Sequence, residues 1–186
     1  MNHRALRRST ALMVGSSLAL IPAVPALADT APAPKSVDID NPQPDQTPPV
    51  ALSNPATRSV DGCWQLPSRY DYSTSIFGAT ITAFSHSPTT GLCRSGNVIS
   101  KIYEVKNDCT KSAWVVTFTT HKAYRFGPSQ TPGTKTAFAT AECAVDMNIS
   151  AYGVGVHYSK QSNVEHDFTT QENSTTYSIK QWTTNP

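Results

Sequence analysis

The chain has 186 residues, and its 15 lysine and arginine residues against 13 aspartate and glutamate residues give a formal net charge of +2. Three basic residues, Arg4, Arg7 and Arg8, lie in the first 28 residues, which contain no acidic residue. The remainder therefore has 12 basic and 13 acidic residues, a net charge of −1. This balance, with no block of like charges, argues against a nucleic-acid partner.

The N-terminal segment has the layout of a cleaved secretory signal. Basic residues at the start are followed by an apolar run, Thr10–Leu20, and by Ala26-Leu27-Ala28, which places small residues where a signal peptidase cuts. The apolar run is shorter than the roughly 20 residues of a permanent transmembrane helix. We expect residues 1–28 to be a signal peptide and the mature protein to be extracellular or periplasmic.

A proline-rich segment follows from residue 29 to residue 57. It has no aromatic residue, few large aliphatic residues and seven prolines: Pro32, Pro34, Pro42, Pro44, Pro48, Pro49 and Pro55. Such a composition buries too little apolar area to offset the entropy of ordering. We expect residues 29–57 to form a disordered linker, which is either a tether or a pro-segment removed later.

The remaining residues, 58–186, are expected to form a single domain, because they contain every aromatic residue and all four cysteines. An even number of cysteines in an exported chain predicts two disulfides, and no C-x-x-C pair indicates a metal site. The cysteines are Cys63, Cys93, Cys109 and Cys143. Three connectivities are possible; we favour Cys63–Cys93 with Cys109–Cys143.

The pattern within this domain is one strand after another. Residues 76–84 alternate, with Phe77, Ala79, Ile81 and Ala83 on one side, and the polar stretch 86–91 that follows is typical of a turn. Residues 98–106 are apolar on both faces at first, as in a central strand. A turn is expected to begin at Asn107-Asp108, before another alternating strand over residues 114–119.

The longest alternating run changes phase near Gly153. Apolar residues occupy odd positions from Cys143 to Ala151 and even positions from Tyr152 to Tyr158. Since side chains on a strand alternate with a period of two, the flip predicts a bulge, bend or sheet crossing within one or two residues of Gly153. Altogether we predict an all-β domain, an antiparallel β-sandwich of about eight strands or a related elongated β fold, with two disulfides.

No motif establishes a catalytic or metal site. The chain lacks a G-x-S-x-G nucleophile elbow. Glu142 and Asp146 would share one face of a strand about 13 Å apart, at ~3.3 Å per residue, too far for paired-carboxylate chemistry without other partners. The densest set of potential metal ligands is His157 with Glu165-His166-Asp167, but adjacent strand residues face opposite sides. We therefore expect no cofactor and no metal, although a Ser-His-Asp arrangement made in space stays open.

The expected function is a non-enzymatic binding module for a protein or glycan. The candidate contact residues are aromatic: Trp114, Tyr152, Tyr158 and Trp182. One alternative is an extracellular hydrolase with an unrecognised site. Another follows from residues 143–151, whose nine-residue alternation is near the length of a membrane-spanning strand. In composition, the serine- and threonine-rich amphipathic segments of the second half resemble those of aerolysin-type pore formers, which implies a protein that inserts β strands into a membrane.

Overall fold

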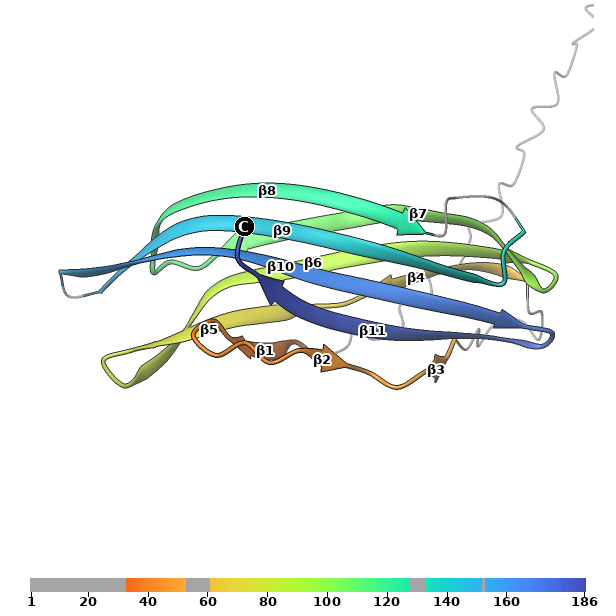
Figure 1. The fold of residues 1–186 in the computed structure, drawn as a ribbon, viewed down its shortest axis with the longest axis horizontal. Helices are drawn as coiled ribbons and strands as arrows, with labels where there is room; N and C mark the ends of the chain where they lie inside the picture. The colour runs from red at the N-terminus through yellow and green to blue at the C-terminus, as the bar shows by residue number, and fades with distance from the viewer. Residues whose placement is uncertain (1–32, 53–60, 128–132, 152) are drawn as a thin grey trace, which may run out of the picture.

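A computed structural model describes residues 33–52, 61–127, 133–151 and 153–186, and these form two layers of long β-strands (Figure 1). The first sheet contains β1 (Lys35–Asp38), β5 (Tyr70–Ile76), β6 (Ala79–Ser95), β4 (Gly62–Pro67) and β7 (Val98–Lys111). The second contains β2 (Asp45–Gln46), β3 (Val50–Ala51), β11 (Ser174–Thr184), β10 (Val154–Gln171), β9 (Thr136–Ala151) and β8 (Val115–Gly127). The predicted all-β class is confirmed, and β4–β11 are the eight strands expected beyond residue 58.

Antiparallel pairing accounts for every strand contact in the described residues except β1 with β5, which is parallel. Strands β8, β9, β10 and β11 form a meander in the second sheet, and β5, β6 and β7 form one in the first. The described residues contain no helix that is long and apolar enough to cross a membrane.

The phase change near Gly153 marks a reversal of the chain. Strand β9 ends at Ala151, β10 begins at Val154, and these two residues are strand partners. Gly153 has a φ of 82°, a backbone conformation that favours glycine. A hairpin with two intervening residues puts positions 151 and 154 on the same face, so odd apolar positions become even ones. The break lies where it was predicted, but it is a hairpin between two strands and not the predicted bulge, bend or sheet crossing.

Two predicted turns are wrong, because both lie inside long strands. Residues 86–91 are the middle of β6, and Asn107-Asp108 are inside β7. The proline that suggested the first turn, Pro88, lies where the partner of β6 changes from β5, ending at the Tyr70–His86 pair, to β4, beginning at the Pro67–Thr89 pair. The N–H that proline lacks therefore falls near a gap between two partner strands.

Part of the segment expected to be a disordered linker is ordered. Residues 33–52 contribute β1 to the edge of β5, and β2 and β3 to the edge of β11. The linker prediction is wrong for these residues because two apolar side chains, Val37 and Ile39, are buried in the core. The predicted signal peptide, residues 1–28, and the boundary at residue 58 lie outside the described residues.

Both favoured disulfides are present. Cys63 and Cys93 are strand partners in the first sheet, whereas Cys109 on β7 and Cys143 on β9 join the two sheets. The core between the sheets is apolar toward each end, with Tyr72 stacked on Phe84 at a centroid distance of 4.4 Å. Buried polar side chains also lie between the sheets, and they include His86, Ser162 and His166.

Candidate functional site

One end of the molecule has no charged side chain over three segments that are far apart in sequence. We call this the uncharged end; its segments are residues 73–84, residues 112–120 and a third segment whose described parts are residues 147–151 and 153–156. Strand pairing brings the segments together, since Ile149 is the partner of both Val115 and Val156. The first sheet joins them through a hydrogen bond of 2.9 Å from the Ser112 N–H to the Ala83 carbonyl.

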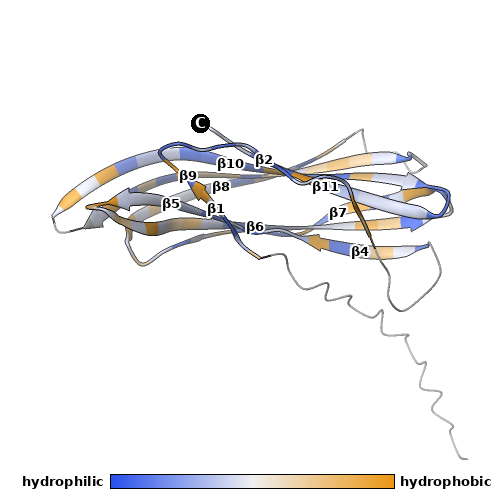
Figure 2. Cartoon of the chain, turned by 90° about the horizontal axis from the view of Figure 1, so that it is seen from below, coloured by the Kyte–Doolittle hydropathy of each residue, from blue (hydrophilic) through white to orange (hydrophobic). Residues whose placement is uncertain are grey.

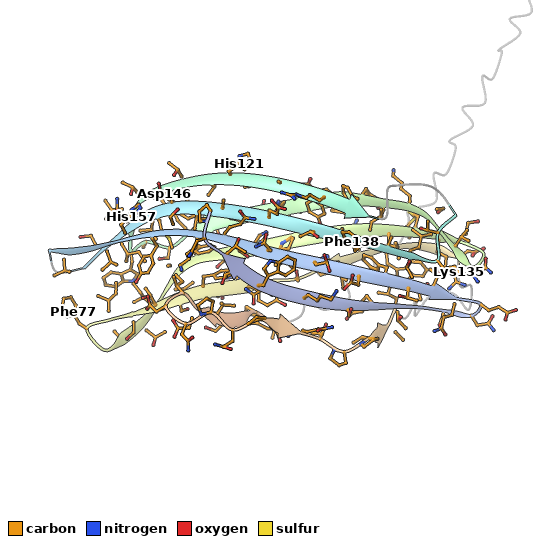
Figure 3. The ribbon with its side chains drawn as sticks, viewed as in Figure 1. Phe77, His121, Lys135, Phe138, Asp146 and His157 are labelled. Carbon is orange, nitrogen blue, oxygen red and sulfur yellow. A yellow bond between two sulfur atoms is a disulfide. The ribbon has the colours of Figure 1, made fainter. Side chains whose placement is uncertain are left out.

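Large apolar side chains are exposed on this end. The exposed fraction is 67% for Phe77, 46% for Trp114, 62% for Val116, 49% for Val154 and 37% for Val156. Figure 2 shows hydrophobic residues at the tip of the β9–β10 hairpin, and Figure 3 places Phe77 at the same end, opposite Lys135. The exposed apolar groups thus gather at one end of the long axis, as expected of an interaction site.

Val154 and Val156 are exposed because the β9–β10 hairpin extends beyond the sheet that should cover it. Ile149, the strand partner of Val156, is fully buried, as is Met147, the partner of Tyr158. Strand partners lie on the same face of a sheet, so the two valines continue the apolar inner face of the sandwich. That face is therefore covered along β9 and uncovered at the start of β10.

Phe77 occupies a strained turn. It lies with Gly78 between the paired residues Ile76 and Ala79, and its φ is 52°, followed by a φ of 79° at Gly78. Two successive positive φ angles define a type I′ hairpin turn, which favours asparagine followed by glycine. A large aromatic residue is disfavoured in this conformation, and such outliers cluster at functional sites. The backbone strain therefore accompanies an exposed phenyl ring at the apex of the turn.

Charged groups begin just beyond the uncharged end. Asp40 accepts hydrogen bonds from Thr74 at 2.7 Å and Tyr158 at 3.1 Å, which tie the two sheets together at this level. On the outer face of the second sheet, His157 Nε2 lies 3.2 Å from an Asp146 carboxylate oxygen (Figure 3). The boundary is therefore polar and engaged in internal contacts, whereas the tip itself is apolar.

The four aromatic residues expected to bind a partner do not form one site. Trp114 belongs to the uncharged end, where its carbonyl accepts a hydrogen bond of 3.4 Å from the Ser150 N–H. Tyr158 packs partly buried against the core, and its hydroxyl oxygen lies 3.0 Å from that of Thr74. Trp182 is half-buried on β11, and Tyr152 lies outside the described residues. Of the expected set, Trp114 is thus the described residue placed at the uncharged end.

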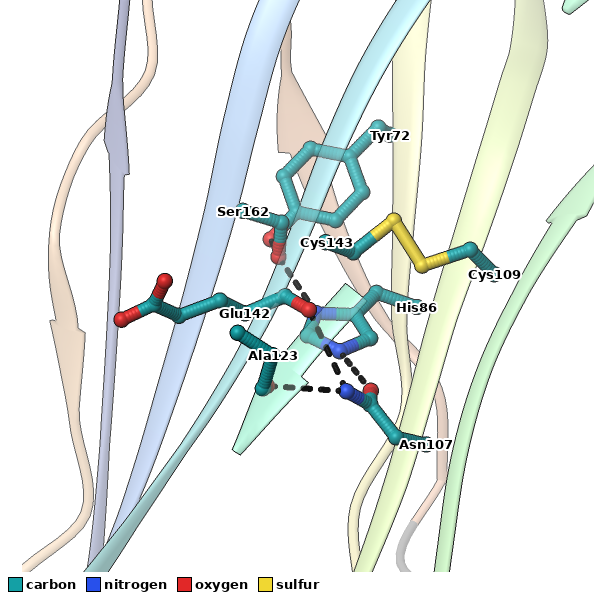
Figure 4. The surroundings of a disulfide bond; sticks show 8 residues. All are labelled: Tyr72, His86, Asn107, Cys109, Ala123, Glu142, Cys143 and Ser162. Carbon is teal, nitrogen blue, oxygen red and sulfur yellow. Dashed lines mark hydrogen bonds between the residues drawn. A yellow bond between two sulfur atoms is a disulfide. The ribbon is translucent and has the colours of Figure 1, made fainter. Parts of the chain in front are cut away.

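A second feature is a buried hydrogen-bond chain between the sheets (Figure 4). Asn107 donates from its amide nitrogen to the carbonyls of Ala123 at 3.1 Å and Glu142 at 3.2 Å, so its oxygen faces His86 Nε2 at 2.8 Å. His86 Nε2 must therefore donate, and Nδ1 accepts from the Ser162 hydroxyl at 2.7 Å. The imidazole is neutral in this arrangement.

The chain continues toward β11. The Ser162 oxygen accepts from the Tyr72 hydroxyl, which in turn accepts from the Gln181 amide at 3.2 Å. Burial raises the pKa of Tyr72 to about 12 and lowers the pKa of His86 to about 4. The whole chain is therefore uncharged at neutral pH and fastens β10 and β11 to the first sheet.

A parallel cluster surrounds His166, which is fully buried. His166 Nε2 lies 2.9 Å from the Ser68 hydroxyl, and Nδ1 lies 2.7 Å from the Thr90 hydroxyl, which also contacts the Tyr124 hydroxyl. Burial, with a smaller contribution from His86, lowers the pKa of His166 to about 3. Both histidines thus connect the sheets in their neutral form.

Neither cluster has the properties of a hydrolase site. Ser162 and His86 are fully buried, so a substrate has no access to that hydroxyl. Ser68 lines a small pocket of about 80 Å³ together with Tyr70 and Ile179. However, a histidine with a pKa of about 3 is a weak general base at neutral pH, and no carboxylate contacts His166 in the described residues. The serine–histidine contacts are therefore best explained as structural hydrogen bonds that join the two sheets.

The other candidate ligands are also separated. Glu165 and Asp167 project to the outer face, where Lys180 Nζ lies 3.0 Å and 2.8 Å from their carboxylates, while His166 points into the core. Glu142 forms its own ion pair with Arg125 at 2.7 Å. Among the described residues, no group of three or more histidine, cysteine, aspartate or glutamate side chains is placed to hold a metal ion.

Sequence reasoning missed Phe77, Val116, Val154 and Val156. Phe77 was grouped with Ala79, Ile81 and Ala83 on one side of a strand, and Val154 and Val156 were grouped with the apolar positions of the longest alternating run. The signal that could have found them is the absence of charge over residues 73–84, 112–120 and 147–156, combined with the hairpin implied by the phase change. No family model, curated protein or solved structure matches this chain.

Proposed function

We propose that this is a secreted, non-enzymatic binding protein that attaches to lipid bilayers through its uncharged end. The observation that carries the proposal is the joint exposure of Phe77, Trp114 and Val154 on an end whose three segments have no charged side chain. Charged groups are expensive to move into a bilayer, and aromatic residues favour its interface. The two disulfides are compatible with an oxidising, extracellular compartment.

The exposed apolar area supports weak, reversible attachment by one copy. Full burial of an aliphatic or aromatic side chain contributes about 1.5–3 kcal/mol. Scaled by their exposed fractions, Phe77, Trp114, Val116, Val154 and Val156 together contribute about 5 kcal/mol. This is comparable with the marginal binding of a single myristoyl chain, about 10⁴ M⁻¹.

A bilayer fits this end better than a glycan or a charged macromolecule. The apolar groups come from two hairpin tips and one inter-strand turn at the end of the long axis, so they can enter a lipid surface together (Figure 1). Glycan recognition needs polar groups that converge beside an aromatic ring. The nearest such groups, Asp40 and Tyr158, are already hydrogen-bonded to each other.

Vesicle flotation with matched double variants tests the proposal. Val116→Ser with Val154→Ser should lower the partition onto phosphatidylcholine vesicles about tenfold, because about 1.4 kcal/mol of apolar transfer is lost. The control is Val50→Ser with Val105→Ser, which removes two valines with exposed fractions of 42% and 40% from outside the uncharged end. Control binding should equal that of the natural protein. An equal loss in both double variants, or no binding by the natural protein, would contradict the proposal.

A further inference from the structure

The second sheet is only three strands wide at the uncharged end, and both of its outer edges are open in the described residues. Pairing between β10 and β11 begins at Gln161 with Thr184, so Val154–Lys160 pair with β9 alone. On the other side, β8 pairs with β9 alone, and its ladder is regular after the bulge between Val115 and Thr117. The parts of these open edges nearest the tip are Val154–Ser159 on β10, which ends before Lys160, and Thr117–His121 on β8, which ends before Lys122.

These two edges lack the usual protection against pairing with another chain. Natural proteins guard edge strands with charged residues, proline or a covering segment. The two parts nearest the tip contain no proline, lysine, arginine, aspartate or glutamate, and the first charged residues on these edges, Lys160 and Lys122, follow directly after them. Other strand edges are protected. Strand β1 covers the edge of β5, and β2 and β3 cover the edge of β11. Strand β7 has five charged residues: Lys101, Glu104, Lys106, Asp108 and Lys111.

We propose that copies attached to a bilayer assemble by edge pairing, with Val154–Ser159 of one copy joining Thr117–His121 of the next. The partner is a second copy of this chain, because the same molecule supplies both open edges, at the same end and of similar length. The inference rests on the proposed attachment to lipid. Attachment orients the copies alike and raises their local concentration, so that weak single-copy binding becomes strong through avidity.

The direction of the strands defines the junction. Both β8 and β10 begin at the uncharged end and run away from it, so two copies with their tips in one membrane pair these strands in parallel. The contact is heterologous, since different surfaces meet, and it therefore extends into a ring or an open array. The resulting sheet has Val154 and Val156 on one face, with His157 and Ser159 on the other, the amphipathic pattern of a membrane-spanning sheet.

Energy transfer between donor- and acceptor-labelled copies on phosphatidylcholine vesicles tests the assembly, with flotation of the same samples reporting attachment. Gly155→Pro removes an edge N–H without adding charge, and Gly155→Ala is its control, since a Cβ at this position meets no atom within 4 Å. Ser159→Lys, which adds a guard charge beyond the tip, is a second disrupting variant, and Ser159→Thr is its control. Thermal unfolding reports whether each variant folds.

Transfer should rise with protein density for the natural protein and both controls. Gly155→Pro and Ser159→Lys should reduce it about fivefold or more, compared at lipid concentrations high enough to keep every variant attached as single copies. Transfer by folded, attached Gly155→Pro and Ser159→Lys equal to that of the natural protein would overturn the inference. Attachment as monomers at every density would overturn it while leaving the proposed function intact. A natural protein that does not attach would overturn both.

Discussion

His86 hydrogen-bonds Ser162 across the sandwich directly beside the disulfide that joins the two sheets (Figure 4). The cause is strand register: His86 is the partner of Cys109 in the first sheet, and Ser162 is the partner of Cys143 in the second. The disulfide and the His86–Ser162 hydrogen bond therefore join the two sheets at the same position along the strands. Beyond this level, the sandwich continues to the uncharged end.

Replacing Ser162 tests the polar cross-link. Ser162→Ala leaves His86 Nδ1 and the Tyr72 hydroxyl without their shared partner in a buried site. The free energy of unfolding, measured in urea, should fall by about 1–3 kcal/mol. Ser159→Ala is the control, since Ser159 is exposed on the same strand and should change stability by no more than about 0.5 kcal/mol. Equal effects of the two variants would show that the buried chain contributes nothing.

The two buried histidines predict a loss of stability in mild acid. Burial lowers their pKa values from 6.5 to about 4 for His86 and about 3 for His166. Below pH 6.5 the unfolded chain therefore binds protons that the folded chain does not, and stability falls as the pH falls. The slope should approach two protons, about 2.7 kcal/mol per pH unit.

Urea unfolding between pH 7 and pH 5 measures this slope, above the range in which most carboxylates titrate. His166→Gln should reduce the slope by about one proton. Ser159→Ala, which leaves both buried histidines in place, should keep the slope of the natural protein. A natural protein with constant stability over this range would refute the assignment of neutral, buried histidines.

The strained turn at Phe77 predicts a trade-off between stability and binding. Phe77→Asn places a residue suited to the first position of a type I′ turn where φ is 52°. Stability should rise by about 1 kcal/mol as backbone strain is relieved, while partition onto vesicles falls severalfold with loss of the exposed ring. Thermal unfolding and flotation measure the two effects. A variant that is less stable than the natural protein would argue against strain at this turn.

Two neighbouring glycines separate backbone strain from packing. A Cβ added at Gly153 or at Gly155 meets no atom within 4 Å, but Gly153 has a φ of 82°. Gly153→Ala should therefore destabilise the fold by about 1–2 kcal/mol, and Gly155→Ala should not destabilise it. Equal effects on the urea midpoint would mean that the hairpin does not depend on the conformation of Gly153.

Much of the fold was predictable because local alternation reports on strands. The change of the apolar positions from odd to even around Gly153 marks the β9–β10 hairpin. Both the alternation and its change of phase can be read from neighbouring residues. The middle of β6 was not predictable in this way, because Pro88 and its polar neighbours have turn chemistry and only the exchange of partner strands makes them extended. The ordered structure of residues 33–52 likewise depends on pairing with the edges of strands that are distant in sequence, and on the burial of Val37 and Ile39 in the core.

The candidate site was only partly predictable. Trp114 was expected from its residue type, whereas the exposure of Val154 and Val156 depends on how far one hairpin extends beyond the opposing sheet. The uncharged stretches of the sequence mark which residues lie at this end, but the length of the overhang depends on the tertiary arrangement of the two sheets. The His86–Ser162 contact also depends on the register of both sheets, which brings together residues 76 positions apart.

The most direct test of membrane attachment is the fluorescence of Trp114 on vesicles containing brominated phosphatidylcholine, whose bromine atoms quench tryptophan within the bilayer. Trp64 is buried in the core and Trp182 is half-buried on β11, so Trp114 is the tryptophan at the uncharged end. The account predicts marked quenching of the attached natural protein and almost none for attached Trp114→Phe. Equal quenching of the two proteins, or an attached natural protein with unquenched Trp114, would contradict entry of this end into the bilayer.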